Sequence, residues 1–291
     1  MNKQKIVTIA PLIFSLVLSS CSIQKLAVKS TSGILVNGMA AINEESDLKL
    51  AEQSIPSNLK LLEALIKSDP NNKKLLLMVA EGYTGYALGF IEDDDPKRAS
   101  QFYLRAKNYA FIILRENEAF NNALSQDLSQ YENALNSFKK EDVPALFWAT
   151  NSWGSYVNLN KTDVNALADL AKIELTMKRA LELDETFYYG GPHLFFGTIL
   201  ASKPRMLGGN PEKAKEHFDT CLRINENKFL MAKLLYAKTY TVQVQNRELF
   251  KALLNEIINA PVDLLPEQRL ANEIAKKKAK ILLEQEDDLF F

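Results

Sequence analysis

Apolar residues recur every three or four positions along most of the chain, which is the pattern of amphipathic α-helices. The stretch 190–221 shows it most clearly, because two such periods are separated by an irregular loop. The loop begins at Pro204 and ends at Asn210-Pro211, where Asn suits a helix N-cap and Pro the first helical turn. Gly197 lies where two crossing helices need a small residue. This stretch therefore predicts a helix, a loop and a second helix that pack together.

The same unit recurs along the chain. The small residues Ala180 and Cys221 occupy matching positions in two helix endings of the same spacing, 177–185 and 218–226, and they lie 41 positions apart. A repeat of this length predicts an all-α fold, in which helix pairs form a tetratricopeptide-like superhelix of the α-solenoid type. The last helix is expected to cap the superhelix, with Lys276, Lys277 and Lys278 solvated on its polar face. The predicted helices cover residues 33–53 (stopped by Pro56), 56–67, a pair within 72–115, 117–140, 145–156, 165–183, 190–221 as a pair, 229–245, 247–259 and 267–283.

Charge and motif content exclude several functions. The formal net charge is −1, so the chain lacks the positive field that nucleic-acid binding needs. It has two histidines and neither a phosphate-binding Gly-rich loop nor paired metal-ligand spacings. We therefore predict a protein that is not an enzyme and that has no cofactor and no metal site. An enzyme remains an alternative only if His193, His217 and the run Asp93-Asp94-Asp95 converge.

The N-terminus resembles a bacterial lipoprotein signal. Lys3 and Lys5 precede an apolar run over residues 6–18, and Leu18-Ser-Ser-Cys21 follows at once. This order predicts a signal peptide at 1–20, a lipidated tether at 21–32 that begins with Cys21, and a helical domain at 33–291. Ser22 in place of Asp favours the outer membrane, facing the periplasm. An ordinary signal peptide with an incidental Cys is the alternative. Cys221 then has no partner for a disulfide.

Several longer motifs have little meaning as helix signals and together resemble one family. They lie in residues 55–63, 80–99, 146–154, 190–193, 207–218 and 270–290. In these motifs the chain resembles the T component of tripartite ATP-independent periplasmic (TRAP) transporters. The resemblance implies an all-helical lipoprotein that pairs with a periplasmic solute-binding subunit. It also implies a homo-oligomer, with a trimer as the suggested state, and a cavity that holds a small apolar organic acid.

Candidate binding residues are rings on the first helix of each pair, because these helices line the concave face of superhelical arrays. Arg205, in the loop after Pro204, is the candidate cation for a ligand carboxylate. Core packing is the alternative for each ring, and solvation for Arg205. The candidate rings are Tyr83, Tyr86, Trp148, Trp153, Tyr156, His193, Tyr236 and Tyr240.

Two functions are compatible with this pattern. The first is an accessory component of a TRAP-type solute transport system, held at a membrane by lipid. The alternative is a tetratricopeptide-type envelope lipoprotein whose groove grips peptide segments during outer-membrane or cell-wall assembly.

Overall fold

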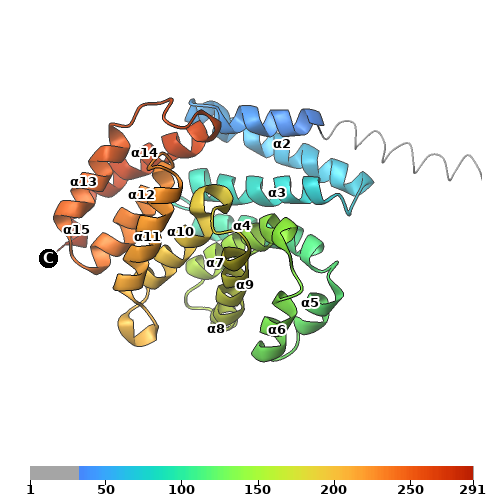
Figure 1. The fold of residues 1–291 in the computed structure, drawn as a ribbon. Helices are drawn as coiled ribbons and strands as arrows, with labels where there is room; N and C mark the ends of the chain where they lie inside the picture. The colour runs from blue at the N-terminus through green and yellow to red at the C-terminus, as the bar shows by residue number, and fades with distance from the viewer. Residues whose placement is uncertain (1–32, 291) are drawn as a thin grey trace, which may run out of the picture.

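The computed structural model describes residues 33–290, and every regular element in that part of the chain is a helix (Figure 1). The all-α prediction is therefore confirmed. The predicted signal peptide, the lipidation at Cys21 and the tether lie outside the described residues. Within 33–290 no helix combines the length and apolar character needed to cross a membrane.

The first described helix covers residues 33–43. The remaining elements, in chain order, are α2 (Leu48–Ser68), α3 (Lys73–Tyr86), the π-helix η1 (Ala87–Ile91), α4 (Pro96–Leu114), α5 (Glu118–Ala123), α6 (Leu128–Leu135), η2 (Lys140–Asp142), α7 (Val143–Leu159), α8 (Val164–Ala168), α9 (Leu170–Leu183), α10 (Phe187–Ser202), η3 (Arg205–Leu207), α11 (Pro211–Ile224), α12 (Leu230–Tyr236), the π-helix η4 (Ala237–Thr241), α13 (Arg247–Ile258), η5 (Pro266–Gln268), α14 (Arg269–Glu284) and α15 (Glu286–Leu289).

Neighbouring helices pack as pairs in the central unit, as the sequence predicts. α10 lies along α11, and a Cβ on Gly197 would come within 3.1 Å of the Phe218 ring, so this crossing requires glycine or a shift of that ring. Asn210 caps α11 by accepting from the amide of Lys213, and Pro211 occupies the first turn. The predicted helix–loop–helix unit is confirmed here. A solenoid arrangement for the whole chain stays a prediction.

The long helix α14, near the C-terminus, packs back onto the N-terminal part of the chain. It contacts α2 as well as α12 and α13 (Figure 1). Arg269 donates a hydrogen bond of 2.7 Å to the backbone carbonyl of Glu44. Asn272, which is 1% exposed, bonds the backbone on both sides of Phe229. This helix therefore links the two ends of the described chain.

The prediction that the lysines of α14 are solvated is wrong for two of the three. Lys276 is buried and pairs with Glu273 at 2.6 Å. The Lys278 ammonium pairs with Asp93 and lies 3.8 Å from Glu92. Because α14 packs against α2 and against Gly89 of η1, Lys278 reaches the acidic groups that follow η1. Lys277 is exposed, as expected.

Two predicted helix boundaries are also wrong. α2 runs through Pro56 without a break, because Asp47 caps its start and a buried stripe continues across the proline, which offsets the lost backbone hydrogen bond. The predicted helix 117–140 is divided into α5 and α6, because Asp127 starts a new helix by accepting from the amide of Gln130.

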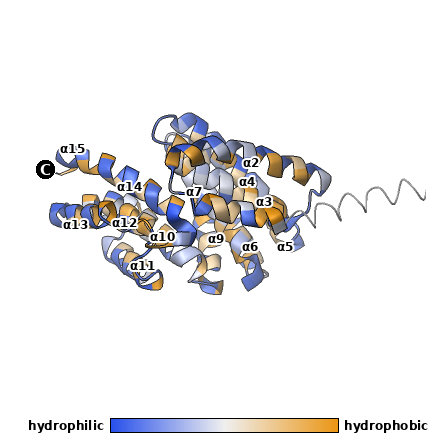
Figure 2. Cartoon of the chain, turned by 90° about the horizontal axis from the view of Figure 1, so that it is seen from above, coloured by the Kyte–Doolittle hydropathy of each residue, from blue (hydrophilic) through white to orange (hydrophobic). Residues whose placement is uncertain are grey.

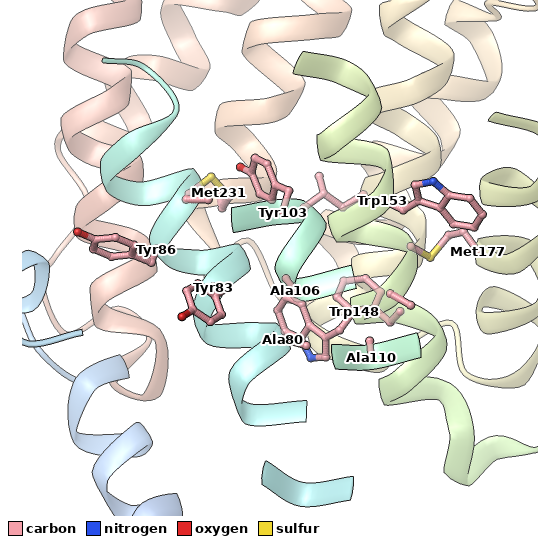
Figure 3. Close-up of a cluster of buried hydrophobic side chains, with 14 of the residues drawn as sticks. Ala80, Tyr83, Tyr86, Tyr103, Ala106, Ala110, Trp148, Trp153, Met177 and Met231 are labelled. Carbon is pink, nitrogen blue, oxygen red and sulfur yellow. The ribbon is translucent and has the colours of Figure 1, made fainter. Parts of the chain in front are cut away.

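The core runs through the middle of the molecule, between helices whose outer faces are polar (Figure 2). α3, α4 and α7 approach closely, because Ala80, Ala106 and Ala110 are fully buried at their contact. Trp148 and Trp153 of α7 fill the adjoining space (Figure 3). The alanines of α3 and α4 thus leave room for the two indole rings of α7.

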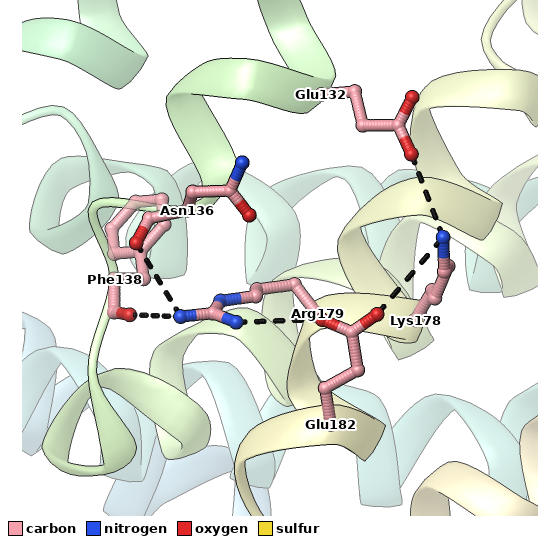
Figure 4. Close-up of polar contacts among 6 residues, drawn as sticks. All are labelled: Glu132, Asn136, Phe138, Lys178, Arg179 and Glu182. Atoms are coloured by element: carbon pink, nitrogen blue, oxygen red, sulfur yellow. Dashed lines mark hydrogen bonds and ion pairs between the residues drawn. The ribbon is translucent and has the colours of Figure 1, made fainter.

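Arg179 on α9 holds the end of α6. Its guanidinium donates to the backbone carbonyls of Phe138 at 2.8 Å and Asn136 at 3.4 Å, and it pairs with Glu182 at 3.3 Å (Figure 4). These carbonyls follow α6, where the backbone groups have no helical partner. Lys178, one position earlier, makes only exposed ion pairs.

Candidate functional site

A cavity of about 90 Å³ lies between the helix 33–43 and helices α2, α3, α7 and α14. Met39 and Ile42 cover one side, and Ile55 and Leu59 of α2 adjoin them. The aromatic side chains that line it are Tyr86, Phe90, Trp148 and Tyr188. The cavity is partly open to solvent, so a molecule could enter it from outside.

Tyr188 reaches the cavity from an unusual backbone turn. Tyr188, Tyr189 and Gly190 all have left-handed φ angles, of 46°, 62° and 79°. A left-handed conformation costs a residue with a side chain about 1–2 kcal/mol, so two consecutive tyrosines store strain here. The thiol of Cys221 and the amide of Asn225 donate to the Tyr189 carbonyl, at 3.5 and 3.3 Å, and hold the turn.

The turn sets the position of the Tyr188 ring. The ring meets Trp148 edge-on, with 4.8 Å between centroids. The Tyr188 hydroxyl donates to the Gln268 side-chain oxygen at 3.4 Å. Strain of this kind persists only where surrounding contacts enforce it, and it concentrates at binding sites. The helix of this unit begins regularly only after Gly190.

Within the described part of the chain, residues 33–290, Glu81 of α3 is the only charged side chain that lines the cavity. Among residues 33–290 its carboxyl group forms no hydrogen bond and no ion pair. Burial raises the pKa of Glu81 to about 7, since the protein around the carboxyl replaces the water that would solvate its charge. The acid therefore titrates near neutral pH.

The other titratable side chains around Glu81 are phenols. Tyr86 and Tyr188 line the cavity and Tyr189 lies beside them. Burial raises the pKa of all three above 10, so they stay neutral between pH 5 and pH 9. Glu81 is thus the group whose charge changes in the cavity over this range. The charged groups farther out are Glu52 on α2, Arg98 on α4 and Glu267 on η5.

Two of the sequence-predicted rings, Tyr86 and Trp148, meet at this cavity. Tyr83 does not line it. Its hydroxyl donates to Glu63 at 2.8 Å and accepts from Arg105 at 3.0 Å, in a network that joins α2, α3 and α4. Tyr83 is 3% exposed and serves packing between these helices.

The remaining predicted rings lie apart from the cavity. Trp153 is buried and donates to Asp169 at 2.9 Å. Tyr236 is buried and stacks on Phe218, with 4.6 Å between centroids. Tyr156 and Tyr240 are half-buried. A ligand-binding role for these residues stays a prediction.

His193 and His217 do approach each other. Their Nδ1 atoms lie 2.9 Å apart, and His193 Nε2 lies 3.1 Å from a carboxylate oxygen of Glu185. Burial, with the neighbouring His193, lowers the pKa of His217 to about 4, so His217 is neutral at pH 7. Residues 33–290 contain no group of three or more side chains placed to hold a metal ion.

The acidic run and Arg205 each have partners within the chain. Asp95 caps α4 by accepting from the amide of Arg98, and Asp93 pairs with Lys278. The run therefore serves capping and packing, apart from the histidine pair. Arg205 is exposed and pairs with Glu212, and its contact with a ligand carboxylate stays a prediction.

Comparison with known proteins places these features in a family. The sequence model of the TRAP transporter T-component family matches residues 44–290. The chain belongs to this family. It is also 25% identical to a protein of Treponema pallidum (strain Nichols) described only as an uncharacterized protein, over 310 aligned positions that cover 94% of each chain. The family resemblance drawn from the motifs is thereby confirmed, and this T component has an accessory role in TRAP transport.

Sequence reasoning missed most cavity residues of this T component, including three polar ones that shape its chemistry, Glu81, Tyr188 and Gln268. A signal existed for Glu81, because it follows the six apolar residues 75–80 on a helix that the pattern places in the core. Nothing in a helical pattern marks Tyr188, since its position depends on the left-handed turn.

Proposed function

We propose that this T component is a lipid-anchored envelope protein that docks the solute-binding subunit of a TRAP transporter. The family match over residues 44–290 carries this proposal. The chain would act by contact, since its sequence has no catalytic motif and its family is a transport component. The homo-oligomer that the family resemblance implies, with a trimer as the suggested state, is part of the same proposal.

The loop between α10 and α11 supports a docking role. Met206 and Leu207 are adjacent and are 96% and 71% exposed, so together they present apolar surface to the solvent. The loop base is fixed, because Gln243 donates to the Lys203 carbonyl at 2.9 Å and the Gly209 amide donates to Pro204 at 3.0 Å. Two apolar side chains on a braced loop suit the centre of a protein interface.

Docking is tested by capture of the solute-binding subunit from the same genome. Changing Met206 and Leu207 together to Glu is expected to weaken capture by about tenfold or more, because charges would enter an apolar contact. Val262→Glu changes another exposed apolar residue, 47% exposed and outside the loop, and is expected to bind as the unchanged protein does. Biolayer interferometry gives the affinities.

Failure of the unchanged protein to bind that subunit would refute the docking role. Capture of cell-wall or outer-membrane assembly proteins instead would favour the envelope scaffold. Binding that persists in the Met206/Leu207 double variant would place the interface elsewhere on the molecule.

We also propose that lipid on Cys21 anchors the protein, in the outer membrane facing the periplasm. The order of Lys3, Lys5, the apolar run and Leu18-Ser-Ser-Cys21 supports this. Cys21→Ala is expected to abolish incorporation of labelled palmitate and to move the protein from the membrane fraction. Cys221→Ala is the matched control, because that thiol is buried in the fold. Equal labelling of both variants would disprove the anchor.

The family resemblance also implies a bound apolar organic acid. The charge of Glu81 favours a different ligand for the cavity of this chain.

A further inference from the structure

The cavity beside α3 combines two features that attract the same kind of ligand. Its carboxylate, Glu81, has no hydrogen bond or ion pair within residues 33–290. Its walls include the rings of Tyr86, Trp148 and Tyr188, whose faces carry partial negative charge. An anion that is half-buried and has no partner is costly, and a cation that enters next to it would reduce that cost.

Other ligand charges fit the cavity less well. An organic anion would place a second negative group beside Glu81, and among residues 33–290 no Lys or Arg lines the walls to neutralise either. A neutral apolar molecule would fill space but would leave the carboxylate without a partner. Both the acid and the rings thus favour a positive charge with apolar groups around it.

We infer that this cavity binds the ammonium group of a small organic cation, with Glu81 as the counter-ion and Tyr86, Trp148 and Tyr188 as a partial aromatic cage. Cation–π contacts of this kind are the usual means of recognising alkylated ammonium groups. Asn43, Asn58 and Gln268 line the same cavity and supply further polar atoms.

The size of the cavity sets the size of the recognised group. Its volume is about 90 Å³, and an apolar cavity of about 150 Å³ accommodates benzene. The recognised group must therefore be smaller than benzene, as a trimethylammonium head or a short alkylammonium is, with the rest of the ligand toward the open side. The strained turn at Tyr188 and Tyr189 places one wall of the cage, which is the use expected for stored strain at a binding site.

The test is isothermal titration calorimetry of the purified full chain at pH 8, where Glu81 is ionised. Three probes have nearly the same shape and differ in charge: choline, 3,3-dimethylbutan-1-ol and 3,3-dimethylbutanoate. Choline is expected to bind at least about tenfold more tightly than the other two, because it alone pairs with both the carboxylate and the rings.

Two variants assign the effect to the cavity. Glu81→Gln is expected to weaken choline binding by about tenfold or more and to leave binding of the neutral alcohol unchanged. Tyr86→Leu is expected to weaken choline binding several-fold through loss of a ring face. Glu52→Gln is the matched control, because Glu52 is an exposed acid of α2 outside the cavity, and it should bind choline as the unchanged protein does.

Equal binding of choline and the neutral alcohol would overturn the inference, and so would tighter binding of the carboxylate or no binding of choline. Choline binding that survives Glu81→Gln would overturn it as well. The experiment uses the chain alone, so a negative result leaves the docking proposal unaffected, and failure to capture a solute-binding subunit leaves this result unaffected.

Discussion

Replacing Glu81 by Gln is expected to stabilise the protein at pH 8 by about 3 kcal/mol. The pKa of Glu81 is about 7 in the folded state, against an ordinary value of 4.5, so the folded protein holds this proton where the unfolded chain has released it. Stability therefore falls as the pH rises from about 4.5 to 7, and the full deficit remains above pH 7. Each unit of pKa difference corresponds to about 1.4 kcal/mol. Glutamine has the same shape and carries no charge at any pH.

Urea unfolding at several pH values measures this effect. The gain from Glu81→Gln should shrink to less than about 1 kcal/mol at pH 5 and vanish below pH 4.5, where both states of the carboxyl group are neutral. The control is Glu52→Gln, an exposed site at which the change should stay within about 0.5 kcal/mol. A loss of stability at pH 8 in the Glu81 variant would mean that the carboxylate has a stabilising partner.

The helix pairs were predictable because their signals are local. Asn210-Pro211 and Asp95-Pro96 each cap a helix with a side chain that accepts from the amide three positions on. Gly197 marks a close crossing that a Cβ would obstruct. The two caps depend on neighbours within one turn of the chain, so sequence spacing alone reveals them.

The return of α14 to the N-terminal helices was not predictable from spacing. The polar face of α14 looks solvated in the sequence, because the acids that meet Lys278 lie far away in the chain, at Asp93 and Glu92. The prediction that a helix stops at Pro56 failed for a related reason. The local cost of this proline in α2 is offset by burial of the stripe on either side, which is a property of the packed molecule.

The candidate cavity was partly predictable. Tyr86 and Trp148 were identified as rings on first helices, and they do meet. Tyr83 and Trp153 follow the same rule, yet their polar atoms bond to Glu63 and Asp169 inside the fold. Helical periodicity shows which residues face the interior of the protein. It does not show which of these residues border a cavity and which pack directly against other side chains.

Asn272→Leu is expected to destabilise the protein by about 3 kcal/mol. The Asn272 side chain is buried, its Nδ2 donates to the Lys228 carbonyl at 3.0 Å, and its Oδ1 accepts from the Leu230 amide at 2.9 Å. Leucine has a similar size but would leave both backbone groups without partners, and each unsatisfied buried group costs about 1–3 kcal/mol. These bonds attach α14 to the start of α12, where a helix amide has no partner of its own.

Urea unfolding at constant pH measures the loss, and hydrogen exchange locates it. The Leu230 amide should exchange much faster in the variant, because it loses its acceptor. Asn255→Leu is the matched control, since Asn255 is an exposed asparagine on α13, and its effect should stay within about 0.5 kcal/mol. If the two asparagine variants unfold at the same urea concentration, packing of apolar side chains alone holds α14 against α12. The closing of the chain onto its N-terminal helices would then not depend on this pair of hydrogen bonds.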